Sequence, residues 1–324
     1  MNDRINILIA SDTNYAAYYG IMLTSLFQTN PDSLFDIYFL TDKTLSGEDA
    51  VKFDKLTKNH NARLFVIPVN VDLVKTFPEV AHIKLPAYYH LSLSNLLPDS
   101  VHKIIYMDGD IIVNGDIRPL WNVDLINYAC AQVINCTFFD EDYYNRLGYD
   151  KKWSYYNNGV SVYNLDYLRE INFSDIAIRY INENKDKVYW MDQDAENALL
   201  YDKILSLPIT YNFQTLFFHH SDWDHYDDSF RKQVLEVAAN PVVIHYCGHL
   251  KPWDRKYYGM PYDKEFRKFM KKSYWPNQYG TMSLKKRLKL HIKRILFPWK
   301  IRERIDTEYT KEYRQKRNGT NSTK

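Results

Sequence analysis

The alternation of apolar runs with helical segments near the N-terminus is the feature that most restricts the fold of this chain. Short apolar runs at residues 6–10, 36–40 and 64–68 are separated by segments at residues 15–28 and 46–59 that have helical character. Strands and helices that alternate in this order form open sheets flanked by helices. The chain is therefore expected to be an α/β protein.

Further patterns continue this α/β organisation towards residue 265. Strands are expected at residues 129–134, 159–164 and 241–246, and helices at residues 86–97, 173–184 and 192–201. The chain has no G-x-G-x-x-G segment, so a dinucleotide-binding site is not expected. A chain of 324 residues can bury one large core or two modest ones. We expect one α/β domain over residues 1–265 and a C-terminal extension over residues 266–324.

Two aspartates, Asp108 and Asp110, flank Gly109 directly after an apolar run that predicts a buried strand. A strand that ends in two carboxylates places them at the carboxyl edge of the sheet, where open α/β proteins bind ligands. Carboxylate oxygens suit Mg²⁺ or Mn²⁺, and such an ion is commonly shared with a phosphate group. An ordinary polar β-turn explains the same three residues, so the motif alone leaves both interpretations open.

Residue usage narrows the class of protein and of ligand. The chain contains 28 Tyr, 7 Trp and 16 Phe, and a surplus of aromatic side chains suits flat polar ligands such as sugars and bases. Its three cysteines, Cys130, Cys136 and Cys247, lack the number and spacing of a disulfide framework or a zinc site. The chain shows no signal-peptide pattern and no run of the ~18 apolar residues that a membrane span needs. We therefore expect a cytoplasmic protein.

The C-terminal extension differs in charge from the rest of the chain. Residues 281–324 contain 14 Lys and Arg against 4 Asp and Glu, although the whole chain has a net charge of only +2. Residues 284–299 combine apolar side chains at helical spacing with basic ones, a pattern typical of a helix that lies on an anionic membrane surface. The alternative is a helix packed on the domain with its basic face in solvent. Binding to nucleic acid is not expected, because no recognised motif accompanies the charge.

Five motifs, in order along residues 5–260, resemble those of glycosyltransferase family 8. They are Ala-Ser-Asp-Thr-Asn-Tyr at residues 10–15, Asp-Gly-Asp at 108–110, Asn-Asn-Gly-Val at 157–160, Asp-Gln-Asp at 192–194 and His-Tyr-Cys-Gly-His-Leu-Lys-Pro-Trp at 245–253. The chain looks most similar to bacterial lipooligosaccharide and lipopolysaccharide galactosyl- or glucosyltransferases, and more distantly to glycogenin. The resemblance implies a GT-A fold, which is an open mixed sheet flanked by helices.

The same resemblance implies an enzyme that moves galactose or glucose from a UDP-sugar to a saccharide acceptor in the synthesis of a surface glycan such as lipopolysaccharide. The transfer would retain the anomeric configuration and would depend on Mn²⁺ or Mg²⁺, which neutralises the departing diphosphate as a Lewis acid. The enzyme would be peripheral at the cytoplasmic face of the inner membrane, held there by residues 284–299.

The resemblance also assigns roles to individual residues. The metal ligands would be Asp108, Asp110 and His245. The donor would be bound by Ala10, Asp12, Asn14, His90, Asp108, Gly109, Asp110, Asn157, Asp192, Gln193, Gly248 and Lys251. Gly248 would let the backbone approach a phosphate, and Lys251 would supply a matching positive charge. Simpler explanations stay open, since Asp12 can cap a helix, and Asp194 as well as Asp192 can belong to the acidic first turn of one.

Asp192 and Gln193 are the candidate catalytic residues. Retaining glycosidases use a carboxylate nucleophile opposite a general acid, but the resemblance places the amide of Gln193 on the back face of the transferred sugar, and an amide is a poor nucleophile. The implied route is substitution on the front face through an oxocarbenium-like transition state, with Asp192 orienting sugar hydroxyls or stabilising the cation. A covalent intermediate on Asp192 is the alternative.

The segment Tyr-Tyr-His-Leu at residues 88–91 departs from the family pattern, which has an arginine where this chain has His90. A neutral imidazole does not reproduce a guanidinium fork, so donor affinity, donor identity or pH dependence is expected to differ. His90 is still expected near the donor. The alternative function is a sugar- or nucleotide-binding module of the same fold that has lost catalysis. A nucleotidyltransferase is disfavoured, because residues 11–15 contain neither glycine nor a basic residue.

Overall fold

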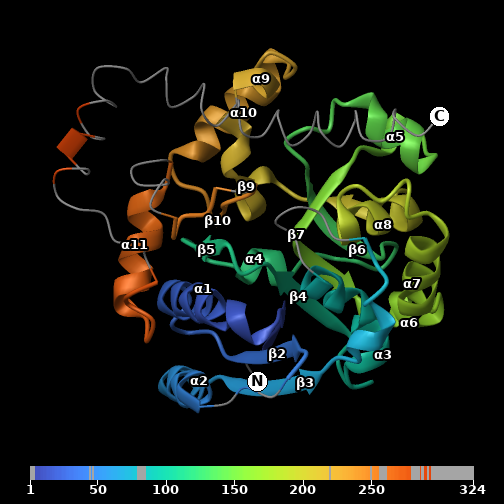
Figure 1. Cartoon of the computed structure of the whole chain (residues 1–324). Coiled ribbons are helices and arrows are strands. Elements are labelled where there is room, and N and C mark those ends of the chain that lie inside the picture. Colours follow the sequence, from blue (N-terminus) through green and yellow to red (C-terminus); the bar gives the residue numbers. More distant parts are fainter. Residues whose placement is uncertain are drawn as a thin grey trace.

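A seven-stranded mixed sheet forms the centre of the protein (Figure 1). The computed structural model describes residues 4–278, except 44, 46, 79–84, 219, 249 and 255–260, together with residues 285, 288, 289 and 292. In spatial order the strands are β3 (Arg63–Pro68), β2 (Phe35–Thr41), β1 (Ile5–Ala10), β4 (Lys103–Met107), β7 (Tyr156–Asn164), β6 (Cys130–Ile134) and β8 (Ile204–Ser206). The expected α/β open sheet is therefore present.

Strand direction changes at β7. The strands β3, β2, β1 and β4 pair in parallel, whereas β7 pairs antiparallel with both β4 and β6. A second, three-stranded sheet consists of β5 (Ile111–Val113), β10 (Val243–His245) and β9 (Phe213–Gln214). Because β5 follows β4 directly, the small sheet carries the C-terminal strand β10 to the carboxyl edge of the large sheet.

Helices cover both faces of the large sheet (Figure 1). One face packs against α1 (Ala16–Thr29), α2 (Gly47–Asn59) and α11 (Asp263–Lys272), and the other against α3 (Leu93–Leu96), α6 (Leu165–Glu170), α7 (Phe173–Glu183) and α8 (Met191–Leu200). The other α-helices within the described residues are α4 (Arg118–Trp121), α5 (Glu141–Leu147), α9 (His220–Trp223) and α10 (Asp228–Ala238).

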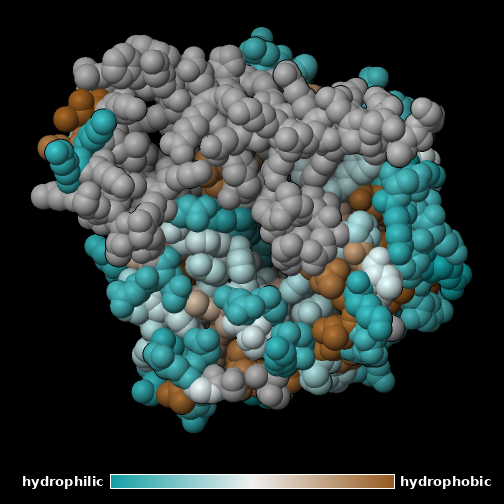
Figure 2. All heavy atoms as spheres, in the orientation of Figure 1, coloured by the Kyte–Doolittle hydropathy of each residue, from teal (hydrophilic) through white to brown (hydrophobic). Residues whose placement is uncertain are grey.

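Alternation of side chains along the strands produces these two layers. In β1, Ile7 and Ile9 join the core beneath α1, whereas Leu8 and Ala10 join the core beneath α8. All four side chains are buried, as expected of strands covered on both faces. The outward surfaces of α2 and α7 are mainly hydrophilic (Figure 2), so these helices are amphipathic covers of the sheet.

One predicted element differs from the structure. Residues 86–97 were expected to form an α-helix, but Leu85–Ser92 forms the 3₁₀ helix η3, and only Leu93–Leu96 is α-helical. Side chains 88–92 are all buried, so the segment lacks the solvent-facing stripe of a surface α-helix. The other predicted strands and helices within residues 1–265 are confirmed, with ends shifted by one to three residues.

The described fold continues past residue 265. That predicted boundary falls inside α11, which packs on α1, and the nearby Trp275 is buried in the same core. The division into a domain and an extension stays a prediction. Most of the predicted basic helix at residues 284–299 lies outside the described residues. Among the helices that are described, none has the length and apolar character needed to span a membrane.

Candidate active site

A pocket of about 350 Å³ opens at the carboxyl edge of the large sheet. Its wall contains all but one of the residues predicted to bind donor or metal: Ala10, Asp12, Asn14, Asp108, Gly109, Asp110, Asn157, Asp192, Gln193, His245, Gly248 and Lys251. The exception is His90. The fold thus gathers residues from five distant segments into one cavity, at the edge where open α/β sheets bind ligands.

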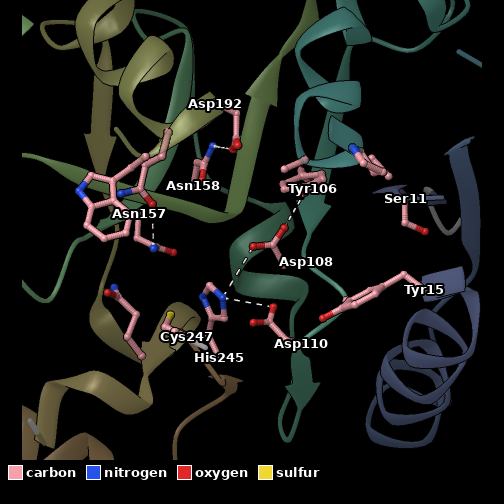
Figure 3. Close-up of a pocket in the computed structure, with 18 of the residues that line it drawn as sticks. Ser11, Tyr15, Tyr106, Asp108, Asp110, Asn157, Asn158, Asp192, His245 and Cys247 are labelled. Carbon is pink, nitrogen blue, oxygen red and sulfur yellow. Dashed lines mark hydrogen bonds and ion pairs between the residues drawn. The ribbon is translucent and has the colours of Figure 1, made fainter. Parts of the chain in front are cut away.

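Asp108, Asp110 and His245 converge in this pocket (Figure 3). The Nε2 atom of His245 lies 3.7 Å from Oδ2 of Asp108 and 3.4 Å from Oδ1 of Asp110. Antiparallel pairing of β10 with β5 sets Ile111 opposite His245, which fixes the imidazole beside the aspartates. Two carboxylates and one imidazole whose ligand atoms all lie within 4.8 Å of one another can hold one divalent ion.

The two aspartates have different electrostatic surroundings. Burial and the charge of Asp110 raise the pKa of Asp108. Burial alone would also raise the pKa of Asp110, but Lys251 and His245 hold it well below its usual range. Nζ of Lys251 makes an ion pair with Oδ2 of Asp110. The pocket therefore concentrates buried negative charge that a cation offsets.

The space behind the metal-ligand candidates requires a glycine at position 159. A Cβ at Gly159 would overlap Cε1 of His245 and lie 2.7 Å from Oδ2 of Asp108. The strand β7 therefore passes directly behind the metal-ligand candidates, and only a residue without a side chain fits there. Gly248, in the pocket wall, has a φ of +86°, a conformation that also favours glycine.

Two further side chains orient the metal-ligand candidates. The hydroxyl of Tyr106 donates to Oδ1 of Asp108 at 2.6 Å. Nδ1 of His245 lies 2.8 Å from Oδ1 of Asn212, so the imidazole donates there and turns Nε2 towards the aspartates. Such outer contacts fix the tautomer and direction of a metal-binding histidine. The sequence did not reveal Asn212 or Tyr106, because neither belongs to a motif.

The N-terminal motif forms one end of the pocket. Asp12 accepts a hydrogen bond from the backbone N–H of Tyr15 and caps the 3₁₀ helix η1 (Thr13–Tyr15), while Nδ2 of Asn14 donates to Asp12. The capping interpretation of Asp12 is therefore confirmed, and the residue still lines the pocket. Ser11 and Tyr15 also line it and were not predicted.

The opposite end of the pocket is formed by the start of α8. Met191 has a φ of +53°, unusual for a residue with a side chain, and the turn presents Asp192 and Gln193 to the cavity. Asn158 donates to Oδ2 of Asp192 at 2.6 Å (Figure 3). Asn157 donates to Oε1 of Gln193 at 2.9 Å. Burial raises the pKa of Asp192 to about 7, against the opposing effect of His90.

Asp194, the third residue of the same motif, is structural. It is fully buried and pairs with Arg146. It also accepts hydrogen bonds from the hydroxyl of Tyr155 and from the backbone N–H groups of Tyr189 and Trp190. These contacts anchor the turn that precedes α8, so the alternative explanation for an acidic residue in a first helical turn applies to Asp194.

His90 does not reach the pocket. Its ring is fully buried, stacks on Tyr106 and lies 2.9 Å from Oε1 of Glu196 and 3.8 Å from Oδ2 of Asp192. Burial lowers the pKa of His90, but Glu196 and Asp192 outweigh it and raise this pKa to about 9. Instead of the expected place beside the donor, His90 lies behind Asp192, because the short imidazole is held by the buried Glu196.

Comparison with solved structures identifies the fold. The galactosyltransferase LgtC, solved in complex with donor and acceptor sugar analogs, superposes with a TM-score of 0.73 at 24% identity, over 88% of this chain and 100% of that one. The bifunctional glycosyltransferase WbbM gives a TM-score of 0.71 at 21% identity, over 89% of this chain and 52% of that one. The fold is that of the GT-A glycosyltransferases, as expected.

The family follows from sequence comparison. Residues 6–257 match the model of glycosyl transferase family 8, and the chain belongs to this family. It is 28% identical to general stress protein A of Bacillus subtilis, over 86% of this chain and 97% of that protein. It is 26% identical to lipopolysaccharide glucosyltransferase WaaO of Escherichia coli, over 84% of this chain and 79% of that protein. The suspected family is thereby confirmed.

Proposed function

We propose that this protein is a metal-dependent, retaining hexosyltransferase that moves galactose or glucose from a UDP-sugar to a saccharide acceptor. The cluster of Asp108, Asp110 and His245 between the two ends of one pocket carries this proposal. Asp12 and Asn14 would bind the uridine at one end, and Asp192 and Gln193 the sugar at the other. The cluster lies between them, where a diphosphate would join the two.

The donor set suits Mn²⁺ or Mg²⁺, because it offers hard carboxylate oxygens and one imidazole nitrogen. When bound, the ion would act as a Lewis acid that offsets the charge of the departing diphosphate. The protein's own part is to hold the ligands in place, since Tyr106 and Asn212 orient Asp108 and His245. Lys251, which pairs with Asp110, would add a positive charge beside the phosphates.

Substitution on the front face of the sugar fits the residues at the start of α8. Gln193 presents an amide, which is a poor nucleophile, and its Oε1 already accepts a hydrogen bond from Asn157. Asp192 is held by Asn158 and would orient sugar hydroxyls or stabilise positive charge that develops on the sugar ring. The bond from the anomeric carbon to the diphosphate would break, and the bond to the acceptor oxygen would form, on the same face of the sugar, so its configuration is retained. The departing phosphate would take the proton of the acceptor hydroxyl.

The acceptor is proposed to be a growing surface glycan such as lipopolysaccharide. Relatives that align over most of this chain are named lipopolysaccharide glucosyl- and galactosyltransferases. The basic residues 284–299 would hold the enzyme at the anionic cytoplasmic face of the inner membrane, close to a lipid-linked acceptor.

A panel of UDP-hexoses tests the proposed reaction. UDP release should occur with one or two hexose donors when a saccharide acceptor is present, and NMR of the product should show the anomeric configuration of the donor. A product of inverted configuration would reject the front-face mechanism. Binding of UDP-sugars without any transfer to a range of saccharide acceptors would favour the alternative, a binding module that has lost catalysis.

A further inference from the structure

An unbroken chain of hydrogen bonds joins the metal-ligand candidates to the sugar end of the pocket. Nδ1 of His245 donates to Oδ1 of Asn212 at 2.8 Å, and Nδ2 of Asn212 donates to Oδ1 of Asn157 at 2.8 Å. Nδ2 of Asn157 then donates to Oε1 of Gln193 at 2.9 Å. Nε2 of Gln193 donates to the hydroxyl of Tyr155 at 3.0 Å, and this hydroxyl donates to Asp194 at 2.7 Å. Every donor points in the same direction along the chain.

Backbone groups fix the orientation of both asparagine side chains. Oδ1 of Asn157 also accepts from the backbone N–H of Gly159, which can only donate. Nδ2 of Asn212 also donates to the backbone carbonyl of Asn157, which can only accept. If either amide turned round, two like groups would face each other in a buried place, which costs free energy.

The two ends of the chain are fixed as well. Asp194 is fully buried, paired with Arg146 and able only to accept. At the other end Asn212 presents its oxygen, so Nδ1 of His245 must carry a hydrogen, and the lone pair of a neutral ring is then on Nε2, which faces Asp108 and Asp110. The side-chain amides of Asn212, Asn157 and Gln193 lie between these two fixed ends.

We propose that Asn212 is a positioning residue that couples the imidazole of His245 to the sugar-facing amide of Gln193. This inference deepens the proposed function and rests on it. Asn212 is fully buried and is not among the residues that line the pocket, so it would touch neither a bound metal nor the donor. It acts by accepting from His245, which keeps Nε2 free for a cation, and by donating to Asn157, which keeps Oε1 of Gln193 in place.

Two substitutions of similar size separate these two roles. In Asn212→Leu both links are lost, and His245 can place its hydrogen on Nε2, where a cation needs a lone pair. In Asn212→Asp the link to His245 survives, because a carboxylate accepts from Nδ1. The carboxylate, however, faces Oδ1 of Asn157. If the amide of Asn157 keeps its orientation, its Oδ1 faces the new carboxylate. If the amide turns round, it loses the hydrogen bond from the backbone N–H of Gly159, and its oxygen faces Oε1 of Gln193.

The experiment measures Mn²⁺ binding to the full chain by electron paramagnetic resonance, and the preference for UDP-galactose or UDP-glucose over UDP by calorimetry at saturating Mn²⁺. Asn212→Leu should weaken Mn²⁺ binding about 10- to 100-fold. Asn212→Asp should keep Mn²⁺ affinity within about threefold of wild type and lower the preference for the UDP-hexose about tenfold. Asn30→Asp is the matched control, because Asn30 is a buried amide with donors and acceptor satisfied, remote from the pocket. Asn30→Asp should change neither the Mn²⁺ affinity nor the preference for the UDP-hexose over UDP.

The inference is overturned if both Asn212 variants match wild type, or if both lose Mn²⁺ affinity and hexose preference to the same extent. In both of these outcomes the wild type still binds Mn²⁺ and prefers a UDP-hexose, so the proposed function would be unaffected. A wild type that binds neither would overturn the proposed function and this inference together.

Discussion

At the scale of single residues, the most unusual feature is a buried ion pair directly behind the pocket. His90 and Glu196 are both completely inaccessible to solvent and lie 2.9 Å apart. Glu196 also accepts from Gln132 and from the hydroxyl of Tyr163, so the carboxylate is well satisfied. Buried pairs of this kind are costly to separate, because removal of one partner leaves the other charge unpaired.

The His90–Glu196 pair predicts how stability depends on pH. The pKa of His90 is raised to about 9 in the folded protein from an ordinary value of 6.5. The folded state therefore binds this proton more tightly, so the stabilisation is fully present below about pH 6.5 and is lost as the pH rises through about 9. Urea unfolding should show a free energy of unfolding that falls by roughly 3 kcal/mol at most across this interval.

A neutral pair provides the control for this prediction. The double variant His90→Gln with Glu196→Gln keeps two hydrogen-bonding side chains and removes both titrating groups. Its free energy of unfolding should change much less than that of wild type between pH 6.5 and 9. An equally steep fall in the double variant would show that His90 is not responsible.

Gly159 gives a second prediction at this scale. In Gly159→Ala the added methyl group would push against His245 and Asp108, so the ligand atoms can no longer converge on one ion. UDP release should fall about 100-fold, since misplacement of reacting groups by about 1 Å costs this much, and Mn²⁺ binding should weaken. Gly115→Ala is the control, because its Cβ would come no closer than 3.3 Å to Val242 and lies away from the pocket. Equal activity of both variants would contradict this account of the site.

At the scale of elements, the sequence predicted the strands best where an apolar run is buried along most of its length. The strands β1, β2 and β3 were predicted from short apolar runs. β1 and β2 are buried along almost their whole length, and β3 pairs with β2 at the edge of the sheet. The motif residues of the pocket were predicted from the resemblance to glycosyltransferase family 8. Asn158 lies in one of these motifs, but no role was predicted for it, and Asn212 lies in none. The role of a buried amide depends on distant neighbours, here Asp192 and His245, which are 34 and 33 residues away. The place of His90 depends likewise on Glu196, 106 residues along the chain.

The contact between α1 and the segment after α11 can be tested with a substitution whose effect on the free energy of unfolding should change sign when Trp275 is removed. A Cβ at Gly20 would overlap the ring of Trp275. Gly20→Ala should therefore lower the free energy of unfolding by about 1–3 kcal/mol in wild type. In the background Trp275→Ala the clash is absent, and the same substitution should raise it by up to about 1 kcal/mol, because alanine favours a helix.

Urea unfolding of the four proteins in this cycle gives the coupling energy. A destabilisation by Gly20→Ala that is the same with and without Trp275 would mean that the segment after α11 is not docked on α1. The coupled result would show that residues up to Trp275 belong to the cooperative fold, beyond the boundary at residue 265 that the sequence predicted.

At the scale of the whole molecule, the mixed sheet explains why one pocket receives residues from the entire chain. The reversal of direction at β7 brings Asn157 and Gly159 beside β4, and the small sheet adds His245 from near the C-terminal end of the described fold. The outward surfaces of α2 and α7 are mainly hydrophilic (Figure 2). The attachment to an anionic surface is proposed for the basic residues 284–299, which follow the described domain in the sequence.

Removal of residues 281–324 tests that role of the basic segment. The shortened chain keeps Trp275 and all residues of the pocket, so it should transfer sugar to a soluble saccharide at a rate within about twofold of the full chain. It should no longer sediment with vesicles that contain anionic phospholipid, because about 1 kcal/mol of attraction is lost for each basic residue near the surface. Vesicles of neutral lipid are the control. Unchanged sedimentation of the shortened chain would reject the membrane proposal.

The measurement that tests the central claim most directly is a Mn²⁺ titration of UDP release from the preferred UDP-hexose, made on wild type, Asp110→Asn and Asp116→Asn. Asp116 is a matched control, because it lies near Asp110 in sequence but pairs with Arg118 at the surface. Wild type and Asp116→Asn should show the same saturable dependence on Mn²⁺, whereas Asp110→Asn should lose release at least 100-fold or require far more Mn²⁺. Release that is independent of Mn²⁺, or that persists unchanged in Asp110→Asn, would contradict a metal-dependent transfer at this site.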